Sequence, residues 1–273
     1  MEIHALQTGT VRVKQFQLTG ASNTLSRFYQ LVFTQKWSEW LPIYAWLIVA
    51  DDELILVDVG ESAKIFEEGF LPSGGLYHKA VETRITEEEE ITHQIKALGY
   101  DVKGVKTVLL THMHGDHMNG IYHFEHAKIH VPKAEYDFAI SKKGPGSGYF
   151  QKNWPSWFQP ELISYGASAE GSFSQSKAFN DHITMVPTPG HSMGHQSVIV
   201  KDGSTNYFIG GDLTYNIDTL KSEVPNVVLP SKDAFDSVKK AHEYVRTKDS
   251  IYLSAHDWNV PKILKEKLAF SQC

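Results

Sequence analysis

The segment 111–117, Thr-His-Met-His-Gly-Asp-His, constrains this 273-residue chain more than any other feature of its sequence. It follows the apolar run Val105–Leu110, which predicts a buried strand that ends in this loop. Residues two apart at an extended strand end can point to the same side, and Gly115 lets the backbone turn and bring further side chains back. The residues with metal-ligand atoms are His112, His114, Asp116 and His117. Chance would supply roughly 0.002 copies of this four-ligand pattern in such a chain, so a metal site is favoured over histidines satisfied by the core or by water.

Charge and cysteine content limit the partners of the chain. The net charge of −6 at pH 7 argues against nucleic acid, because a polyanionic partner favours a basic surface. The single cysteine is Cys273, so we expect neither an internal disulfide nor a thiolate ligand. Residues 1–20 do not resemble a signal peptide, and the longest apolar run, Ile43–Ala50, is too short to span a bilayer. We therefore expect a cytoplasmic protein with no membrane partner.

Five apolar runs end in polar residues that can bind a metal or support its ligands. Leu54–Val57 ends in Asp58, Val105–Leu110 in the His112 loop, Ile183–Val186 in His191, Asn206–Ile209 in Asp212, and Ile251–Ser254 in His256. If these strands lie in layered sheets, their carboxyl ends bring the polar groups to one rim, where open αβ folds place their sites. The repeated pattern therefore predicts one shared site.

The number of donors fits two divalent metal ions. Three imidazoles suit one ion: His112, His114 and His191. Asp116, His117 and His256 suit the second, and Asp212 can bridge the pair. Nitrogen and oxygen donors of this kind bind Zn²⁺, our expected metal, as well as Mn²⁺, Fe²⁺ or Co²⁺. Two such ions would hold a shared water as hydroxide and polarise a carbonyl or phosphoryl oxygen, which predicts hydrolysis.

Local patterns predict further elements outside the site. Ile3–Leu18 has the pattern of two short strands around Gly9. The pattern at 86–98 predicts a helix, because Thr86 can cap it with Glu89 in a capping box and Gly99 can end it. No repeat or linker is present, so we expect a single domain over residues 1–273.

Two aromatic-rich insertions interrupt this pattern, near 23–40 and 142–166. The first can be a buried amphipathic helix, an aromatic lip over a substrate or a contact in a homodimer. The second has the composition of a long surface excursion, and we favour a wall that faces the substrate. The candidate pocket residues are Phe28, Phe33, Trp37, Phe150, Trp154 and Trp157.

The motifs described so far resemble the metallo-β-lactamase superfamily. They are the His-x-His-x-Asp-His loop, the Pro-Gly-His turn at 189–191, the Gly-Asp at 211–212 and the late His256. The resemblance extends from Asp58 to Asp257 and implies an α+β fold, an αββα sandwich of two mixed β-sheets with helices on the outer faces. It agrees with the ligand roles given above. It also implies that Asp58 supports the metal loop without binding metal, and that His195 supports the turn that carries His191.

Tyr215 makes the resemblance narrower. It lies three residues beyond Asp212 and resembles the active-site tyrosine of the quorum-quenching N-acyl homoserine lactonases, as do the intervals from His191 to Asp212 and on to His256. This implies attack of a bridging hydroxide on the lactone carbonyl, with Tyr215 stabilising the oxyanion and Asp116 protonating the departing ring oxygen. A tyrosine that only packs at a strand end is the alternative.

Other reactions on this fold stay open. A phosphotriesterase, or another ester or thioester hydrolase, would use the same donors, although a glutathione thioester would require a basic cluster that the sequence lacks. A nuclease is disfavoured by the acidic balance, and a flavodiiron oxidoreductase would carry a carboxylate in place of His114. We therefore expect a metal-dependent hydrolase whose substrate is a small lactone or ester.

Overall fold

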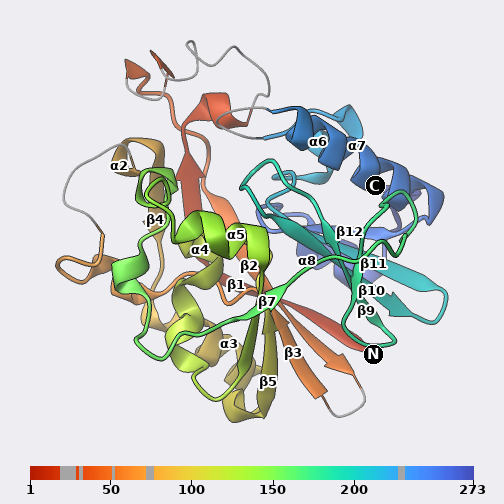
Figure 1. The fold of residues 1–273 in the computed structure, drawn as a ribbon, viewed down its shortest axis with the longest axis horizontal. Coiled ribbons are helices and arrows are strands. Elements are labelled where there is room, and N and C mark those ends of the chain that lie inside the picture. The colour runs from red at the N-terminus through yellow and green to blue at the C-terminus, as the bar shows by residue number, and fades with distance from the viewer. Residues whose placement is uncertain (19–28, 31–32, 51–52, 72–76, 227–230) are drawn as a thin grey trace.

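The computed structural model describes residues 1–18, 29–30, 33–50, 53–71, 77–226 and 231–273. Two β-sheets run through these parts of the chain (Figure 1). The first has seven strands in the order β4-β1-β2-β3-β5-β6-β7. Its strands are β1 Glu2–Val13, β2 Leu41–Ala50, β3 Glu53–Val57, β4 Val81–Arg84, β5 Val105–Leu109, β6 Lys128–Pro132 and β7 Glu161–Ile163. Pairing is antiparallel from β4 to β3 and parallel from β3 to β7, so the sheet is mixed.

The second sheet has five strands in the order β12-β11-β10-β9-β8. Its strands are β8 Lys177–Ala178, β9 Ile183–Pro187, β10 Gln196–Asp202, β11 Thr205–Gly211 and β12 Ile251–Ser254. Only β11 and β12 pair in parallel, so this sheet is mixed as well.

Seven α-helices accompany the sheets in the described residues. They are α2 Tyr77–Ala80, α3 Ile91–Ala97, α4 Gly115–Met118, α5 Lys133–Ala139, α6 Ile217–Ser222, α7 Lys232–Thr247 and α8 Val260–Glu266. Short 3-10 turns lie at Gln15–Gln17, Ala63–Phe66, Glu87–Glu89, Val102–Gly104, Asn119–His123, Pro145–Ser147, Gln151–Asn153 and Phe270–Gln272. None of these described helices is long and apolar enough to cross a membrane.

The alternation of side chains along β2 explains the layers. Trp46 and Ile48 face the second sheet and share a buried cluster with Val198 and Leu253, whereas Leu47 points to the opposite face. That opposite face is covered by α3, α4 and α5, and the outer face of the second sheet is covered by α6 and α7 (Figure 1). The structure therefore confirms the predicted α+β fold, an αββα sandwich.

The N-terminal segment forms one bulged strand, so the predicted pair of strands around Gly9 is wrong. The register of β1 against β2 shifts between Gln7 and Thr10, which accommodates an extra residue. Gly9 has φ of +87°, and a Cβ at this position would lie 2.3 Å from the carbonyl oxygen of Arg84. The glycine therefore permits both the bulge of β1 against β2 and the close approach of β4, where the sequence pattern suggested two separate strands.

The helix predicted at 86–98 is interrupted at Glu90. The capping box is present, since the N–H of Thr86 donates to Glu89 at 2.8 Å, and Gly99 follows the helix with φ of +86°. Glu90 itself is extended, with ψ of 149°, so a 3-10 turn precedes α3. Its carboxylate accepts hydrogen bonds from Ser62 Oγ at 2.9 Å and from the N–H of Ala63 at 2.8 Å. The break in the helix therefore coincides with tertiary hydrogen bonds between Glu90 and residues 62 and 63, which the local sequence pattern does not show.

The insertion at 142–166 is not a surface excursion along its whole length. Tyr149 and Phe158 are buried and belong to the core cluster on the helical side of the first sheet. β7 lies within the same insertion and forms the edge of that sheet. The aromatic content of this segment thus reflects packing as much as exposure.

Candidate metal centre

Ends of strands from both sheets assemble the centre. β3 ends at Asp58, β5 leads into the His112 loop and α4, and β9 leads into the turn that carries His191. β11 and β12 are parallel neighbours, so Asp212 and His256 follow them at the same edge. The five predicted strand ends therefore meet at one rim, as the sequence indicates.

Two groups of potential ligand atoms form at this rim, each within 4.8 Å. The first group consists of His112, His114 and His191, and the second consists of Asp116, His117, Asp212 and His256. In the first, His112 Nε2 lies 3.0 Å from His114 Nδ1, which lies 2.9 Å from His191 Nε2. In the second, Asp212 Oδ1 lies 3.0 Å from His117 Nε2 and 3.1 Å from His256 Nε2. All seven predicted ligands are thus brought together.

Asp212 stands between the two groups. While its Oδ1 faces His117 and His256, its Oδ2 lies 3.4 Å from His191 Nε2. One carboxylate therefore offers an oxygen to each group, which is the arrangement that a bridging ligand requires.

The donor atoms fit a divalent cation. His117 Nε2 and Asp212 Oδ1 are buried and lie 3.0 Å apart, yet within the described part of the chain neither completes a hydrogen bond of normal geometry, with the other or with a third group. Buried polar atoms normally have a partner, and an unprotonated imidazole nitrogen and a carboxylate oxygen are both metal ligands. These two atoms converge as they would on an ion.

Hydrogen bonds behind two of the histidines turn their Nε2 atoms toward the centre. His117 Nδ1 lies 2.9 Å from Asp58 Oδ2, and His256 Nδ1 lies 2.7 Å from the carbonyl oxygen of Pro42. Both oxygens accept from Nδ1–H, so each ring presents Nε2 to the centre, where a cation would take the place of any proton on that nitrogen.

Asp58 and His195 lie behind the ligand atoms. Asp58 is buried and accepts from the N–H of Thr111 at 2.7 Å and from its hydroxyl at 2.9 Å. His195 uses both ring nitrogens, since Nδ1 lies 2.8 Å from Thr188 Oγ1 and Nε2 accepts from the N–H of Asp212 at 3.1 Å. Burial lowers the pKa of His195 to about 3, which keeps its ring neutral.

The two groups differ in electrostatics. Burial, with the neighbouring imidazoles, lowers the pKa values of His112 and His191 well below the ordinary value, so these rings are neutral and ready to bind a cation. Burial also acts to lower the pKa of His117, but the carboxylates, led by Asp212, outweigh it and raise that pKa well above its usual range. At His256, too, the carboxylates, led by Asp212, outweigh burial and raise the pKa. The carboxylates of the second group therefore favour positive charge beside them, which a bound cation would supply in place of the imidazole protons.

Tyr215 borders both groups. Its ring centroid lies 5.2 Å from that of His256 and 6.5 Å from that of His191. On its other side it packs against Val11 and Ile43. Burial, followed by the charges of Asp212 and Asp116, raises the pKa of Tyr215 well above its ordinary value, so the hydroxyl keeps its proton. The position combines packing with access to the centre.

The structure does not gather the predicted pocket residues into one wall. Phe28 lies outside the described residues, Phe33 is 62% exposed, and Trp37 is covered by Lys14, whose Nζ lies 3.7 Å from the ring centroid. Trp154 and Trp157 pack against the core beside Phe158. Among the five that the structure describes, Phe150 lines a cavity of about 650 Å³ together with Tyr149, whose ring lies 5.0 Å from that of His114.

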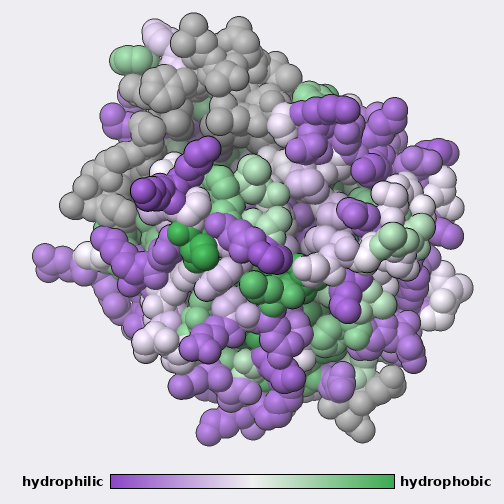
Figure 2. Space-filling view, viewed as in Figure 1, coloured by the Kyte–Doolittle hydropathy of each residue, from purple (hydrophilic) through white to green (hydrophobic). Residues whose placement is uncertain are grey.

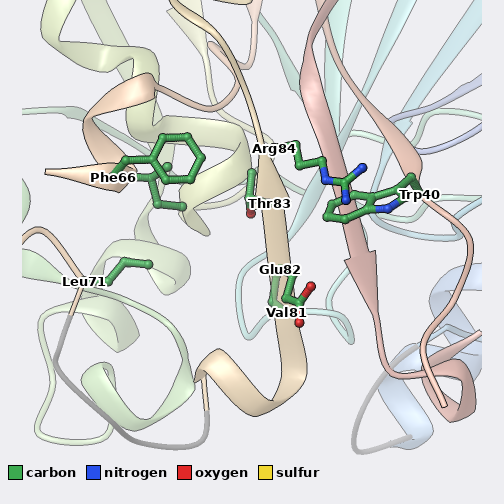
Figure 3. A pocket seen from close by; sticks show the side chains of 8 residues that line it. Trp40, Phe66, Leu71, Val81, Glu82, Thr83 and Arg84 are labelled. Carbon is green, nitrogen blue, oxygen red and sulfur yellow. The ribbon is translucent and has the colours of Figure 1, made fainter. Parts of the chain in front are cut away.

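A second cavity, of about 470 Å³, lies along β4. Trp40 and Arg84 stack at one side, with the guanidinium 3.9 Å from the ring centroid, and Phe66 and Leu71 lie across the strand (Figure 3). Val81 lines this cavity and also packs against the cluster that contains Tyr215. On the face shown in Figure 2, hydrophilic side chains surround separate small apolar patches.

One residue of the site has no signal in the sequence. Glu135 looks like an ordinary acidic residue in the first turn of a helix, but it is buried and contacts both the His112 loop and the His191 turn. Only tertiary structure reveals this contact.

Comparisons with known proteins agree with this geometry. The family model described as the metallo-beta-lactamase superfamily matches residues 38–256. The N-acyl homoserine lactonase AiiA of Bacillus thuringiensis subsp. kurstaki is 25% identical over 218 residues, which are 80% of this chain and 82% of that protein. A probable metallo-hydrolase of Mycobacterium bovis, Mb2322c, is 31% identical over 182 residues, 64% of this chain and 57% of that protein.

Solved structures show the same fold. An N-acyl homoserine lactone hydrolase with N-hexanoyl-L-homoserine bound at its catalytic metal centre superposes with a TM-score of 0.74, at 21% identity and over 96% of this chain and 95% of that chain. AidC, a dizinc quorum-quenching lactonase, gives a TM-score of 0.63 at 17% identity, over 94% of this chain and 88% of that chain.

Proposed function

The chain belongs to the metallo-beta-lactamase superfamily and is a metal-dependent hydrolase, and we propose that it opens the lactone ring of N-acyl homoserine lactones. The observation that carries the proposal is the position of Tyr215, whose ring borders His191 of one ligand group and His256 of the other. The curated relatives named N-acyl homoserine lactonase support it.

We place two divalent cations, Zn²⁺ in the first instance and Mn²⁺, Fe²⁺ or Co²⁺ as alternatives, in the two groups. The three-histidine group would hold one, Asp116, His117 and His256 would hold the other, and Asp212 would contact both. Bound there, the cations would activate a water molecule as the nucleophile and polarise the lactone carbonyl.

The chain's own residues supply the remaining steps. The protonated hydroxyl of Tyr215 donates a hydrogen bond to the carbonyl oxygen as negative charge develops on it. Asp116 is the most exposed carboxylate of the centre, at 19%, and we assign it the proton transfer: it takes a proton from the attacking water and gives it to the ring oxygen as the acyl C–O bond breaks. The product is an open-chain acid with a free hydroxyl, and one proton is released near neutral pH.

The acyl chain requires an apolar surface beside this centre. We place it in the cavity along β4, because Val81 connects that cavity to the Tyr215 cluster and Trp40 and Phe66 offer apolar area (Figure 3). The cavity at Tyr149 and Phe150 is the second candidate.

Ring opening by metal-loaded protein tests the proposal. Proton release is followed with N-acyl homoserine lactones of short and long chains, and a chelator should abolish it. Phosphotriesters and thioesters are assayed in parallel. Turnover of either in place of the lactones, with about two bound metals, would overturn the lactonase proposal and favour the alternative hydrolase.

A homodimer and a cytoplasmic location stay predictions. Analytical ultracentrifugation would test the first.

A further inference from the structure

Glu135 lies in the first turn of α5 and is fully buried. Its Oε1 accepts hydrogen bonds from the N–H of Met113 at 3.0 Å and from the hydroxyl of Tyr149 at 2.8 Å. Its Oε2 accepts from Ser192 Oγ at 2.7 Å and from the N–H of Gly194 at 2.9 Å. Each carboxylate oxygen is therefore fixed by one backbone donor and one hydroxyl.

The two oxygens hold two different loops. Met113 lies between His112 and His114, whereas Ser192 follows His191 directly. These are the loops that carry the three-histidine group, and they meet where His114 Nδ1 lies 2.9 Å from His191 Nε2. One side chain thus connects the backbones on both sides of that contact.

The His191 turn packs tightly on the start of α5, and the donors around the side chain of Glu135 match a carboxylate. A Cβ added at Gly194 would lie 2.1 Å from the backbone nitrogen of Glu135, so the turn packs directly on the start of α5. Both backbone N–H groups can only donate, and a side chain must offer an acceptor in each direction to satisfy them. A glutamine amide offers an acceptor in one direction and a donor in the other.

We propose that Glu135 is a positioning residue that sets the spacing of the two loops and so prepares the three-histidine group for its cation. The inference rests on the metal role proposed for these histidines and is independent of the identity of the substrate. The four hydrogen bonds of the Glu135 carboxylate go to the loops and to Tyr149, and none goes to a histidine side chain. Glu135 would therefore affect the bound metal by positioning the loop backbones.

The test compares Glu135→Gln with Glu90→Gln in the 273-residue chain, by competition titration of Zn²⁺ against a chromophoric chelator. Glu90 is a matched control, because its carboxylate also accepts several internal hydrogen bonds but contacts neither loop. We expect Glu135→Gln to weaken one of the two Zn²⁺ affinities by ten- to a hundredfold, as for partners that orient ligands, and Glu90→Gln to keep both.

Ser192→Ala covers the case in which Glu135→Gln fails to fold. It removes one bond to Oε2 without changing charge, so a smaller loss at the same site separates positioning from electrostatics. Glu135→Asp keeps two oxygens and should recover part of the affinity. Parental affinity at both sites in Glu135→Gln, or in Ser192→Ala where Glu135→Gln does not fold, would overturn the proposal, as would an equal loss in Glu90→Gln. Parental protein that binds two Zn²⁺ but opens no lactone would overturn the proposed function alone.

Discussion

His114 Nδ1 and His191 Nε2 lie 2.9 Å apart, although 77 residues separate them in the chain. The first follows a strand of the seven-stranded sheet and the second follows a strand of the five-stranded sheet, so the contact joins the two halves of the sandwich. Burial keeps the ring of His191 neutral, and with His112 the pair presents three nitrogen donors to one point. The centre therefore depends on how the sheets are held together at this rim.

Metal removal should lower stability as well as activity. A ligand that binds only the folded state stabilises it by about 2.7 kcal/mol at a hundred times its dissociation constant. We expect thermal unfolding of chelator-treated protein to occur at a lower temperature, with recovery on addition of Zn²⁺. An unchanged midpoint would argue that the two ligand groups hold no tightly bound ion.

Asp116→Asn should abolish turnover. The substitution removes the carboxylate assigned to proton transfer, one oxygen of which lies 3.6 Å from His256 Nε2 and 3.7 Å from His117 Nε2. Steady-state kinetics with metal content measured on the same sample will separate loss of metal from loss of proton transfer. Full activity in this variant would contradict the dinuclear mechanism.

Tyr215→Phe should reduce kcat by roughly ten- to a thousandfold, as for the loss of one oxyanion donor. Packing against Val11 and Ile43 should survive, because the ring is kept. Tyr244→Phe is the matched control, since that hydroxyl donates to Glu170 at 3.1 Å away from the centre. Equal kcat in both variants would show that Tyr215 only packs at the strand end.

The sequence predicts which candidate ligands come together, because their places in the fold are set locally. A residue that follows a strand lies at the rim, whatever the details of packing, and this holds for the candidate ligands His191, Asp212 and His256 and for Asp58 behind them. Glu135 and Glu90 could not be predicted in the same way. Each has the pattern of a solvated acidic residue at a helix start, and its partners come from distant loops. The role of the aromatic residues is equally hard to predict, because a buried core and a substrate wall both use aromatic side chains.

Glu61 should make the metal-free protein less stable as pH rises. Burial raises the pKa of Glu61 to about 7, against hydrogen bonds from Asn119 and Ser62 that favour the charged form. The folded state thus binds this proton more tightly than the unfolded state. The protonation of Glu61 therefore contributes fully to the free energy of unfolding below the unfolded pKa of 4.5, and this contribution is lost as pH rises to about 7.

Urea unfolding across this pH range, compared with Glu61→Gln, checks the prediction. The variant carries no charge at this position, so its stability relative to the parental protein should increase with pH, by up to roughly 3 kcal/mol, and level off above pH 7. A constant difference between the two proteins would contradict the raised pKa.

Phe66→Ala should alter the preference for acyl-chain length. Phe66 lines the cavity along β4 but is exposed, so its removal should cost little stability. Each methylene buried against an apolar wall is worth about 0.8 kcal/mol, so kcat/KM should fall for long-chain lactones and hold for short ones. Phe150→Ala is the paired variant in the other cavity. If only Phe150→Ala lowers kcat/KM for the long-chain lactones, the acyl chain lies beside Tyr149 and His114, and the cavity along β4 has another role.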